Sequence, residues 1–467
     1  MPIPVTNDTQ RFYKTTRLLV VGLIAFIIYT GSDHLPIVQL CLCVVSTLLA
    51  VWPALSWIKN QPYQLPAFET FMLTSISAYI LPLATNHVGL ELYETAVVTK
   101  AALGVVLFQL CALFAFFQFQ AIARREPFWT DPLFTRDISS WLPTGLWINL
   151  LYVLSSRFLI EIPGDIDSIL RAVFFGINTA CTFLLGRSWG EGKLRANLKI
   201  SVGLALLIQA ILLMASLYLI TALSGFLVFM LAYVSGGRKI PIVTLALVFI
   251  VLSVMHNGKS AMRAKYWDID APIQIELSHL PDFYAEWFEN GLTPALENED
   301  EATNRLLLER TSLIHMLCLV IDHQETGLPF LNGITYGHIL PQLVPRIFWP
   351  DKPTGQISKK TLSIYYGLQD EHAAKSTSIA FGQLAEAYAN FGFFGLGLLG
   401  IFFGWANKLI ATWTKSSPLI SNGGFIMILL MAWSLQIELP MSSWIASFYQ
   451  ASLCVLGIPF ILRRISG

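Results

Sequence analysis

The sequence predicts an all-α integral membrane protein, and three observations support this prediction. Hydrophobic residues make up 55% of the 467 residues and charged residues only 13%, and the mean hydropathy is +0.60. Apolar runs close to the ~20 residues that cross a bilayer recur along the chain. The connections between these runs alternate between basic and acidic. A soluble fold of two or three domains, which the length alone would suggest, is therefore not expected.

About twelve of these runs are long and apolar enough to be transmembrane helices. They cover residues 16–32, 36–55, 66–85, 97–119, 140–156, 168–186, 199–219, 221–236, 240–256, 391–412, 423–440 and 444–462. The chain therefore divides into nine helices over residues 1–256, one large loop over residues 257–390, and three helices over residues 391–467. No internal repeat interrupts this order.

The orientation follows from the basic residues, because Lys and Arg are retained on the cytoplasmic side of short connections. They follow every second helix, whereas acidic residues such as Asp33, Glu91 and Asp165 lie in the connections between. Both termini are then cytoplasmic and the large loop lies outside. The most apolar part of the loop, residues 305–321, carries charges at its middle, so we expect an amphipathic or re-entrant helix there.

Charge and cysteine usage limit the possible functions. The net charge is zero, so the overall charge indicates nothing about nucleic-acid or acidic partners. No nucleic-acid partner is expected of a membrane protein of this kind. Five of the six cysteines lie in apolar runs and no Cys-x-x-Cys is present, which argues against a disulfide framework or a zinc site. The first apolar run lacks a following cleavage site, so we expect it to be retained as a membrane helix.

A basic cluster follows the ninth helix in the segment "HNGKSAMRAKYWD", which contains Lys259 and Arg263. Its Gly-Lys-Ser is not a phosphate-binding loop, because Ser253 stands where the first glycine is needed. Cations just outside a membrane helix are explained either by a bound anion or by contact with lipid headgroups. Both explanations remain open at this point.

The middle of the loop predicts two short helices. Residues 278–291 place aromatic side chains on one face and end at Gly291, as expected of an interfacial helix or of a surface that stacks on sugar rings. In the second helix, Arg310 is either paired with a loop carboxylate or faces a polar cavity. His315 on the same helix is more simply explained as a core histidine.

The segment "LVPRIFWPDKPTG", residues 343–355, places charged residues between prolines, where neither a long helix nor a central strand can form. We expect a rigid cationic segment that binds phosphate, since Arg and Lys donate charge-assisted hydrogen bonds to phosphate oxygens. The cations available to converge there are Lys259, Arg263, Arg310, Arg346 and Lys352. Carboxylates are not clustered at ligand spacing, so no metal or other cofactor is expected, although Asp351 can still hold a divalent ion.

The segment "GQLAEAYANFG" contains the carboxylate of greatest interest, Glu386. Ser376, Thr377 and Ser378 are candidate caps for a helix beginning near Ile379, which places Glu386 and Asn390 on one face at i, i+4. At the edge of the membrane this carboxylate suits a general base. A structural ion pair with a loop arginine is the alternative.

Glycines follow in the same helix, within the apolar run "FGFFGLGLLGIFFG". Gly400 and Gly404 form a small-xxx-small pair, a pattern typical of closely packed membrane helices. We therefore expect another helix to cross here.

The run from Pro345-Arg346 to Trp349-Pro350-Asp351-Lys352-Pro353, followed by Glu386 and Asn390 in the next helix, resembles the Wzy-type oligosaccharide repeat-unit (O-antigen) polymerases. Such proteins carry an Arg-x-x-x-Pro-x-Lys-Pro-like element and then a Glu…Asn-Phe-Gly pattern in and after a large late loop. The resemblance covers about 100 residues, and elsewhere it is only hydropathic. It implies a GT-C-like membrane glycosyltransferase in the bacterial inner membrane, with the large loop in the periplasm.

The resemblance also implies a reaction and its participants. The enzyme would polymerise undecaprenyl-pyrophosphate-linked oligosaccharides into O-antigen, capsule or exopolysaccharide. Glu386, Arg346 and Asp351 would be catalytic. Pyrophosphate and glycan would be bound by Lys259, Arg263, Arg310, Tyr336, Arg346, Lys352 and Asn390. Membrane lipid and a polysaccharide chain-length regulator are the further partners implied.

Three other functions remain open from the sequence. An O-antigen ligase uses the same donor with a different acceptor. A lipid-linked oligosaccharide flippase or transporter also often has about 12 helices, but such proteins usually consist of two matching halves, whereas this chain divides into nine and three. A non-catalytic assembly subunit would tolerate loss of Glu386 together with the arginines.

Overall fold

The computed structural model describes residues 7–60, 65–120, 127–130, 141–160, 164–217, 219–239, 241–266, 275–297, 312–344, 348–376 and 378–466. Every regular element in these ranges is helical, which confirms the all-α prediction. The chain forms two compact units, the first from Met1–Pro132 with Leu308–Tyr449 and the second from Leu133–Leu307 with Gln450–Gly467. These units combine distant segments and cut across the predicted boundaries at residues 256 and 390.

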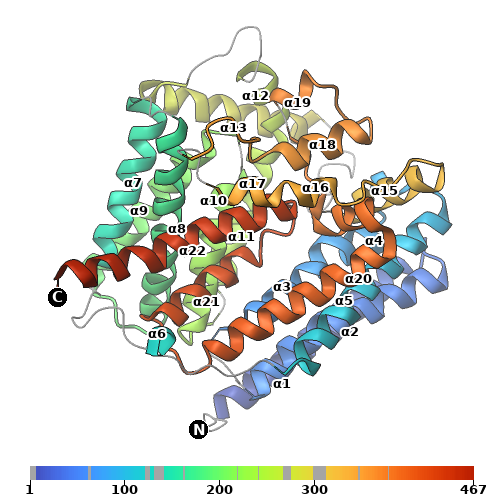
Figure 1. The fold of residues 1–467 in the computed structure, drawn as a ribbon, viewed down its shortest axis with the longest axis horizontal. Helices are drawn as coiled ribbons and strands as arrows, with labels where there is room; N and C mark the ends of the chain where they lie inside the picture. Colours follow the sequence, from blue (N-terminus) through green and yellow to red (C-terminus); the bar gives the residue numbers. More distant parts are fainter. Residues whose placement is uncertain are drawn as a thin grey trace. The chain divides into compact units, whose positions relative to one another are not determined.

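The first unit contains the N-terminal helices and most of the helices that follow residue 308 (Figure 1). Its helices are α1 (Asn7–Gly31), α2 (Ile37–Asn60), α3 (Ala67–Ser75), η1 (Ile76–Ile80), α4 (Leu81–Ala84), η2 (Val88–Leu90), α5 (Thr95–Gln118), α6 (Pro127–Thr130), α15 (Ile314–Glu325), α16 (Ile334–Gly337), α17 (Ile339–Leu343), α18 (Ile357–Tyr365), α19 (Ala373–Ser376), α20 (Gly382–Trp413) and α21 (Asn422–Trp433). The last helix, α22 (Met441–Ser466), begins in the first unit and continues into the second.

Helix α20 runs along α5 (Figure 1), and two glycines permit the close approach. A Cβ atom added to Gly400 would lie 2.4 Å from the carbonyl oxygen of Phe108, and one added to Gly404 would lie 2.2 Å from that of Ala112. These distances are shorter than any normal contact, so only glycine fits. The predicted helix packing through Gly400 and Gly404 is confirmed.

Helix α20 is divided by a kink at Phe391 and Gly392, where Gly392 has φ +61° and ψ −145°. Glycine adopts this conformation more readily than other residues. The helix also begins later than predicted, at Gly382, and its N-cap residue Phe381 makes no side-chain capping bond. Ser376 and Ser378 are therefore not its caps, and Thr377 lies outside the described residues. Instead, the Gln383 N–H donates to the Ile437 carbonyl at 3.2 Å.

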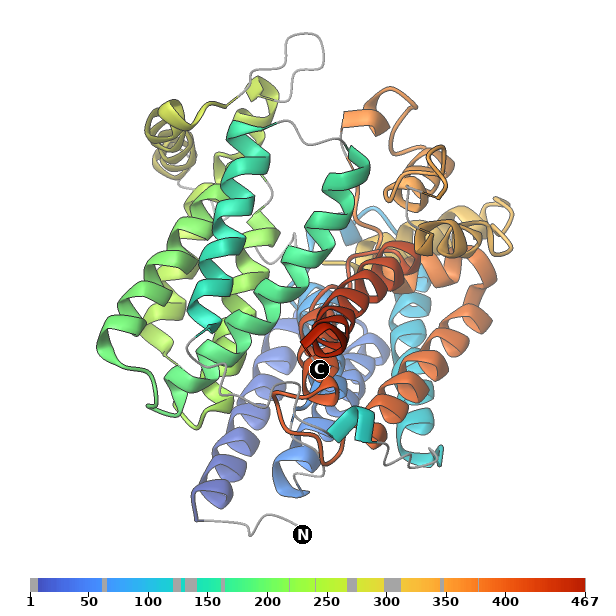
Figure 2. The ribbon, with the colours of Figure 1, turned by 60° about the vertical axis from the view of Figure 1, so that its left-hand side comes forward.

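The second unit is built around four helices, α7 to α10, which lie side by side in green (Figure 2). Its helices are α7 (Leu142–Leu154), η3 (Ser155–Leu159), α8 (Gly164–Gly190), α9 (Ala196–Met214), α10 (Leu219–Ser235), α11 (Ile242–Asn257), α12 (Lys259–Tyr266), η4 (Leu277–His279) and α13 (Leu280–Glu297).

Helix α13 corrects two predictions. It continues to Glu297, so Gly291 lies within the helix and does not end it. A Cβ atom added to Gly291 would lie 2.1 Å from the Val254 carbonyl oxygen. Gly291 therefore allows α11 and α13 to cross closely. Phe283 and Trp287 are 2% and 0% exposed, and the Trp287 indole donates to the Met255 carbonyl at 2.6 Å. These two rings therefore pack in the core of the unit and are not presented to lipid or to sugar.

A helix lies at each of the twelve predicted runs, although the run 423–440 ends early, at Trp433. Six helical stretches among the described residues are long and apolar enough to cross a membrane: Phe12–Gly31, Ile37–Asn60, Ala67–Ala84, Thr95–Gln118, Ala196–Met214 and Gly382–Trp413. Shorter apolar helices occur at Ala222–Ser235, Ile242–Asn257 and Asn422–Trp433. The chain is thus a helical membrane protein.

Candidate active site

Glu386 lies in the first part of α20 and is completely buried, with 0% of its surface exposed. One carboxylate oxygen, Oε2, accepts a hydrogen bond from the Met441 N–H at 2.6 Å. The other oxygen, Oε1, has no hydrogen-bond partner of normal geometry in the part of the chain that the structure describes, although the nearby Thr335 hydroxyl interacts with the carboxylate. A buried polar atom without a partner is costly, so this oxygen needs an explanation.

The hydrogen bond from Met441 explains the position of only one carboxylate oxygen, Oε2. Met441 is the first residue of α22, and the first amide groups of a helix have no partner within the helix. A carboxylate at this end also interacts favourably with the helix dipole. Oε2 thus has a structural role at the start of α22, whereas Oε1 is left for another role.

Asn390 fixes the backbone that covers Glu386. Its Nδ2 donates to the Glu386 carbonyl and to Thr335 Oγ1, both at 2.8 Å, and its Oδ1 accepts from the Gly333 N–H at 2.9 Å. The predicted placement of Glu386 and Asn390 one turn apart is confirmed. Asn390 ties the segment that contains α16 to α20, and the Leu331 N–H adds a bond to the Ala389 carbonyl at 2.9 Å.

A chain of buried hydroxyl groups continues from this segment to α18 and α22. Ser358 Oγ donates to the Thr335 carbonyl at 3.2 Å, lies 2.7 Å from Ser442 Oγ, and lies 3.1 Å from His338 Nδ1. Because the hydroxyl has one hydrogen, Ser358 accepts from Ser442 and from His338. Nδ1 of His338 then carries the hydrogen, and Nε2 is the nitrogen with a lone pair. Burial lowers the pKa of His338, which keeps the ring neutral at pH 7.

Two further ionisable side chains lie near this network. The Tyr336 ring stacks on Phe391 with centroids 6.1 Å apart, and burial together with the charge of Glu386 raises the pKa of Tyr336. Burial lowers the pKa of Lys359, and the nearby Glu438 opposes that change. Tyr336 was predicted as a site residue, whereas Lys359 and Glu438 were not.

The proline-rich segment is held by its own lysine. Lys352 is only 8% exposed, and its ammonium donates to the Val344 carbonyl at 2.6 Å and the Gln342 carbonyl at 3.4 Å. Gln342 Nε2 in turn donates to the carbonyls of Pro353 and Thr354, at 2.9 and 3.0 Å. Lys352 and Gln342 therefore connect residues 342–344 to residues 352–354. The role of Lys352 as a pyrophosphate ligand stays a prediction.

The remaining predicted site residues are distributed more widely. Asp351 is exposed on the turn, and Arg310 and Arg346 lie outside the described residues. Lys259 and Arg263 belong to α12 in the second unit, where Arg263 Nη2 donates to the Leu217 carbonyl at 3.0 Å. The structure thus brings together Glu386, Asn390 and Tyr336, and it describes the α12 cations only within their own unit.

The described residues contain no cluster of side chains suited to bind a metal ion. Within the described ranges, no three His, Cys, Asp or Glu side chains come together at a distance suited to a metal ion. Glu386 is surrounded by hydroxyl, amide and backbone groups. The chemistry that this arrangement supports is hydrogen bonding and proton transfer.

His315 is a core histidine, as expected from the sequence. Its ring stacks on that of His87 with centroids 4.9 Å apart, and its Nδ1 lies 3.0 Å from Ser312 Oγ. Burial, with a smaller effect of His87, lowers the pKa of His315 to about 4. The ring is therefore neutral at pH 7, and it contacts His87 and Ser312.

The polar residues that sequence reasoning missed are Thr335, Ser358 and Ser442. Each is an isolated hydroxyl residue with no spacing pattern, and each lies at least 28 positions from Glu386. One signal was present near Ser442: Glu438 and Pro440 interrupt the apolar residues at the end of the predicted run 423–440. Proline starts a helix readily, so a helix start near Glu386 could have been considered.

Comparison with known proteins identifies a family for the chain. No curated protein and no solved structure matches it significantly. A family model described as a domain of unknown function (DUF8712) matches residues 146–428, a range that includes the proline-rich segment, Glu386 and Asn390. Since this match covers more than half of the 467 residues, the chain belongs to the DUF8712 family.

Proposed function

We propose that the protein is a membrane glycosyltransferase that polymerises polyprenyl-pyrophosphate-linked oligosaccharide repeat units into a surface polysaccharide. One observation carries the proposal: Glu386 is fully buried, and its Oε1 has no hydrogen-bond partner among the described residues. Oε2 and Asn390 hold the carboxylate and its cover in place. A fixed carboxylate with one oxygen to spare is suited to accept a proton.

The reaction assigns a role to each group. Glu386 Oε1 takes the proton from a hydroxyl group of the acceptor sugar as that oxygen attacks the anomeric carbon of the donor glycan. The bond between this carbon and the pyrophosphate oxygen breaks, and polyprenyl pyrophosphate leaves with the bonding electrons. Cations stabilise the negative charge that develops on the leaving group; Arg346, with Arg310, has this role in the proposal.

The burial of Glu386 imposes a condition on this mechanism. The acceptor hydroxyl reaches Oε1 only if the segment from Asn332 to His338 moves away from α20. Gly333 has φ +91°. This segment is held to α20 by Asn390 and by backbone hydrogen bonds, and to α18 by the contacts of Ser358 with Thr335 and His338. Opening therefore breaks a small number of polar contacts and leaves the packing of α20 on α5 intact.

The proposal includes an orientation in the bacterial inner membrane. Twelve crossings place both termini in the cytoplasm and residues 257–390 in the periplasm. Helices at all twelve apolar runs support this arrangement, and six of the described stretches meet the length and hydropathy of a membrane helix. A cysteine introduced at Glu299 is expected to react with a membrane-impermeant thiol reagent in intact spheroplasts. Labelling only after lysis would contradict the orientation.

The direct test is polymerisation in vitro. Purified protein is incubated with undecaprenyl-pyrophosphate-linked oligosaccharides extracted from the source bacterium, and the products are separated by size. A ladder with increments of one repeat unit, together with release of undecaprenyl pyrophosphate, is the expected result. A ligase would transfer glycan only when its separate acceptor is added, and a flippase would give no new glycosidic bond.

Arginine variants test the proposed leaving-group stabilisation in the same assay. Arg346→Ala is expected to abolish the ladder while the protein remains folded. Arg346→Lys is expected to restore only part of the activity, because lysine keeps the charge but loses the bidentate fork. Normal polymerisation by Arg346→Ala would remove Arg346 from the mechanism.

A further inference from the structure

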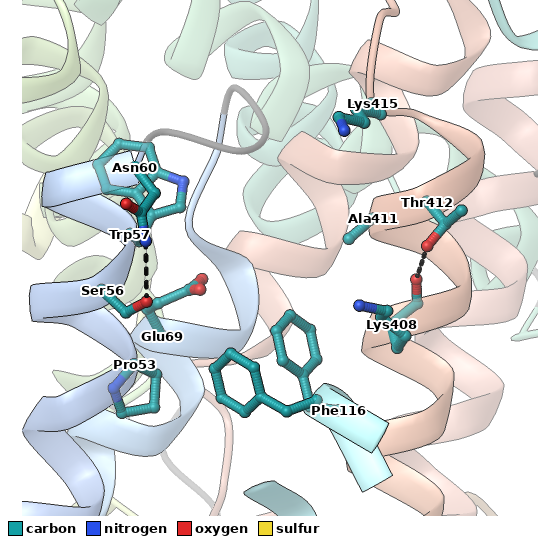
Figure 3. A pocket seen from close by; sticks show the side chains of 11 residues that line it. Pro53, Ser56, Trp57, Asn60, Glu69, Phe116, Lys408, Ala411, Thr412 and Lys415 are labelled. Atoms are coloured by element: carbon teal, nitrogen blue, oxygen red, sulfur yellow. Dashed lines mark hydrogen bonds between the residues drawn. The ribbon is translucent and has the colours of Figure 1, made fainter. Parts of the chain in front are cut away.

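A pocket of about 310 Å³ lies in the first unit, at the ends of four helices (Figure 3). It is lined by the last turns of α2, α5 and α20 and by the first turn of α3. At the ~30 Å³ that a water molecule occupies in the liquid, this volume equals on the order of ten waters. The pocket is therefore large enough for a small polar group.

The pocket contains charges of both signs on opposite walls. The Glu69 carboxylate, on a residue that is 3% exposed, points into the pocket from α3, and the Lys408 side chain points toward it from α20 (Figure 3). The Lys408 ammonium lies 5.5 Å from the centroid of the Phe116 ring. Lys415, which also lines the pocket, is exposed to solvent.

The position of the pocket indicates where its ligand comes from. The four helices belong to stretches that are long and apolar enough to cross a membrane, and their ends then lie at the level of the lipid headgroups. Exposed aromatic side chains near the pocket, Trp52 and Phe117, pack against each other with centroids 4.9 Å apart. They offer an apolar surface for acyl chains beside a polar pocket.

We propose that this pocket binds the phosphoethanolamine headgroup of a membrane phospholipid. The phosphate interacts with Lys408 and Lys415 through charge-assisted hydrogen bonds, and the ammonium donates hydrogen bonds to Glu69. A purely anionic headgroup places no cation at Glu69 and is repelled by it. A choline headgroup has no N–H group to donate to the carboxylate.

This site is separate from the Glu386 network. The pocket lies where α20 ends, beside Lys408. Glu386 lies near the other end of this helix, before the kink at Gly392. Loss of lipid binding and loss of polymerisation are therefore distinguishable outcomes. Neither result decides the other.

Native mass spectrometry of the delipidated, detergent-purified protein tests the proposal. Phosphatidylethanolamine or phosphatidylglycerol with matched acyl chains is titrated in separate samples. Phosphatidylethanolamine is expected to bind about tenfold more tightly, as one charge-assisted hydrogen bond allows. Equal binding of the two lipids, or tighter binding of phosphatidylglycerol, overturns the proposal.

Charge-neutral variants assign the site. Glu69→Gln is expected to lower phosphatidylethanolamine affinity about tenfold and to remove the preference over phosphatidylglycerol. Lys415→Gln changes an exposed residue, so folding is preserved, and it is expected to weaken binding of both lipids several-fold. The matched controls are Glu91→Gln and Lys14→Gln, at exposed positions outside the pocket. Unchanged lipid affinities in both pocket variants would contradict the assignment.

A soluble competitor distinguishes the source of the headgroup. Free phosphoethanolamine at millimolar concentration is expected to displace the lipid only partly, since it lacks the acyl chains. Binding of free phosphoethanolamine in the absence of any lipid binding would overturn the assignment to a membrane lipid.

Discussion

The two parts of α20 are buried for different reasons. From Gly382 to Asn390 the helix is covered by polar contacts to α16 and α22, which include buried carboxylate and amide groups. After the kink at Gly392 it packs on α5 through glycines and apolar side chains. Polar burial stabilises a fold less efficiently than apolar burial. The first part therefore carries groups that the packing of the helix does not need, whereas the second part is the scaffold that positions them.

The scaffold part is tested by two alanines in the same helix. Gly404→Ala places a Cβ 2.2 Å from the Ala112 carbonyl oxygen, whereas at Gly397 the nearest neighbouring atom is Cys111 Sγ at 3.7 Å. Overpacking against backbone is expected to destabilise Gly404→Ala by about 3 kcal/mol. Gly397→Ala is the matched control and should melt close to the wild type. Thermal unfolding of both variants in detergent measures the difference, and equal melting temperatures would show that α20 and α5 do not pack closely.

Two asparagines, one in each part of α20, test the polar contacts of the part from Gly382 to Asn390. Asn390 and Asn407 both donate to the carbonyl four residues earlier, but only Asn390 also bonds Gly333 and Thr335. Asn390→Ala is expected to lose about 2 kcal/mol of stability, and Asn407→Ala less than about 1 kcal/mol. A larger loss in Asn407→Ala would reverse the comparison.

Asn390→Ala should also loosen the cover of Glu386. Hydrogen exchange of the Gly333 and Tyr336 amide groups is expected to become faster in this variant, while exchange in α5 stays unchanged. Equal protection of these amides in Asn390→Ala and Asn407→Ala would show that Asn390 does not hold the segment.

A smaller effect concerns His315, which lies in α15, a helix that packs against α20 and α5. The pKa of His315 is about 4 in the folded protein and 6.5 for the free side chain. Between these pH values the unfolded chain binds more protons than the folded protein. The free energy of unfolding therefore falls as the pH is lowered through this range. Between pH 7 and pH 5 the loss is about 1 kcal/mol, allowing for the partial exposure of the ring. His315→Phe is expected to remove this part of the pH dependence of the melting temperature; an unchanged dependence would exclude His315 as its source.

The sequence predicted the scaffold better than the polar site, for a physical reason. Helices and the Gly400–Gly404 pair are marked by residues three to twenty positions apart, which leave periodic patterns in the chain. The i, i+4 relation of Glu386 and Asn390 is local in the same sense, and it was also predicted. The partner helix of Gly400 and Gly404, α5, is almost 300 positions away and was not predicted.

The rest of the site depends on contacts between distant segments. Thr335 and Ser442 come to Glu386 from 51 positions before and 56 positions after it, and a single hydroxyl residue gives no periodic signal. Lys352 was interpreted as a phosphate ligand because lysine donates charge-assisted hydrogen bonds to phosphate oxygens. The partners that the structure gives it are carbonyl groups of its own segment, which sequence alone does not reveal.

The most direct test of the account is turnover by Glu386→Gln, with binding of the lipid-linked donor measured on the same purified sample. Glutamine keeps an oxygen that accepts from the Met441 N–H, so the start of α22 stays satisfied while the base is removed. Polymerisation is expected to fall by about 10²–10⁴-fold, with donor binding and melting temperature retained, whereas the exposed control Glu91→Gln keeps full activity. Turnover of Glu386→Gln within a few-fold of the wild type would contradict the account and leave Glu386 as a structural partner of α22.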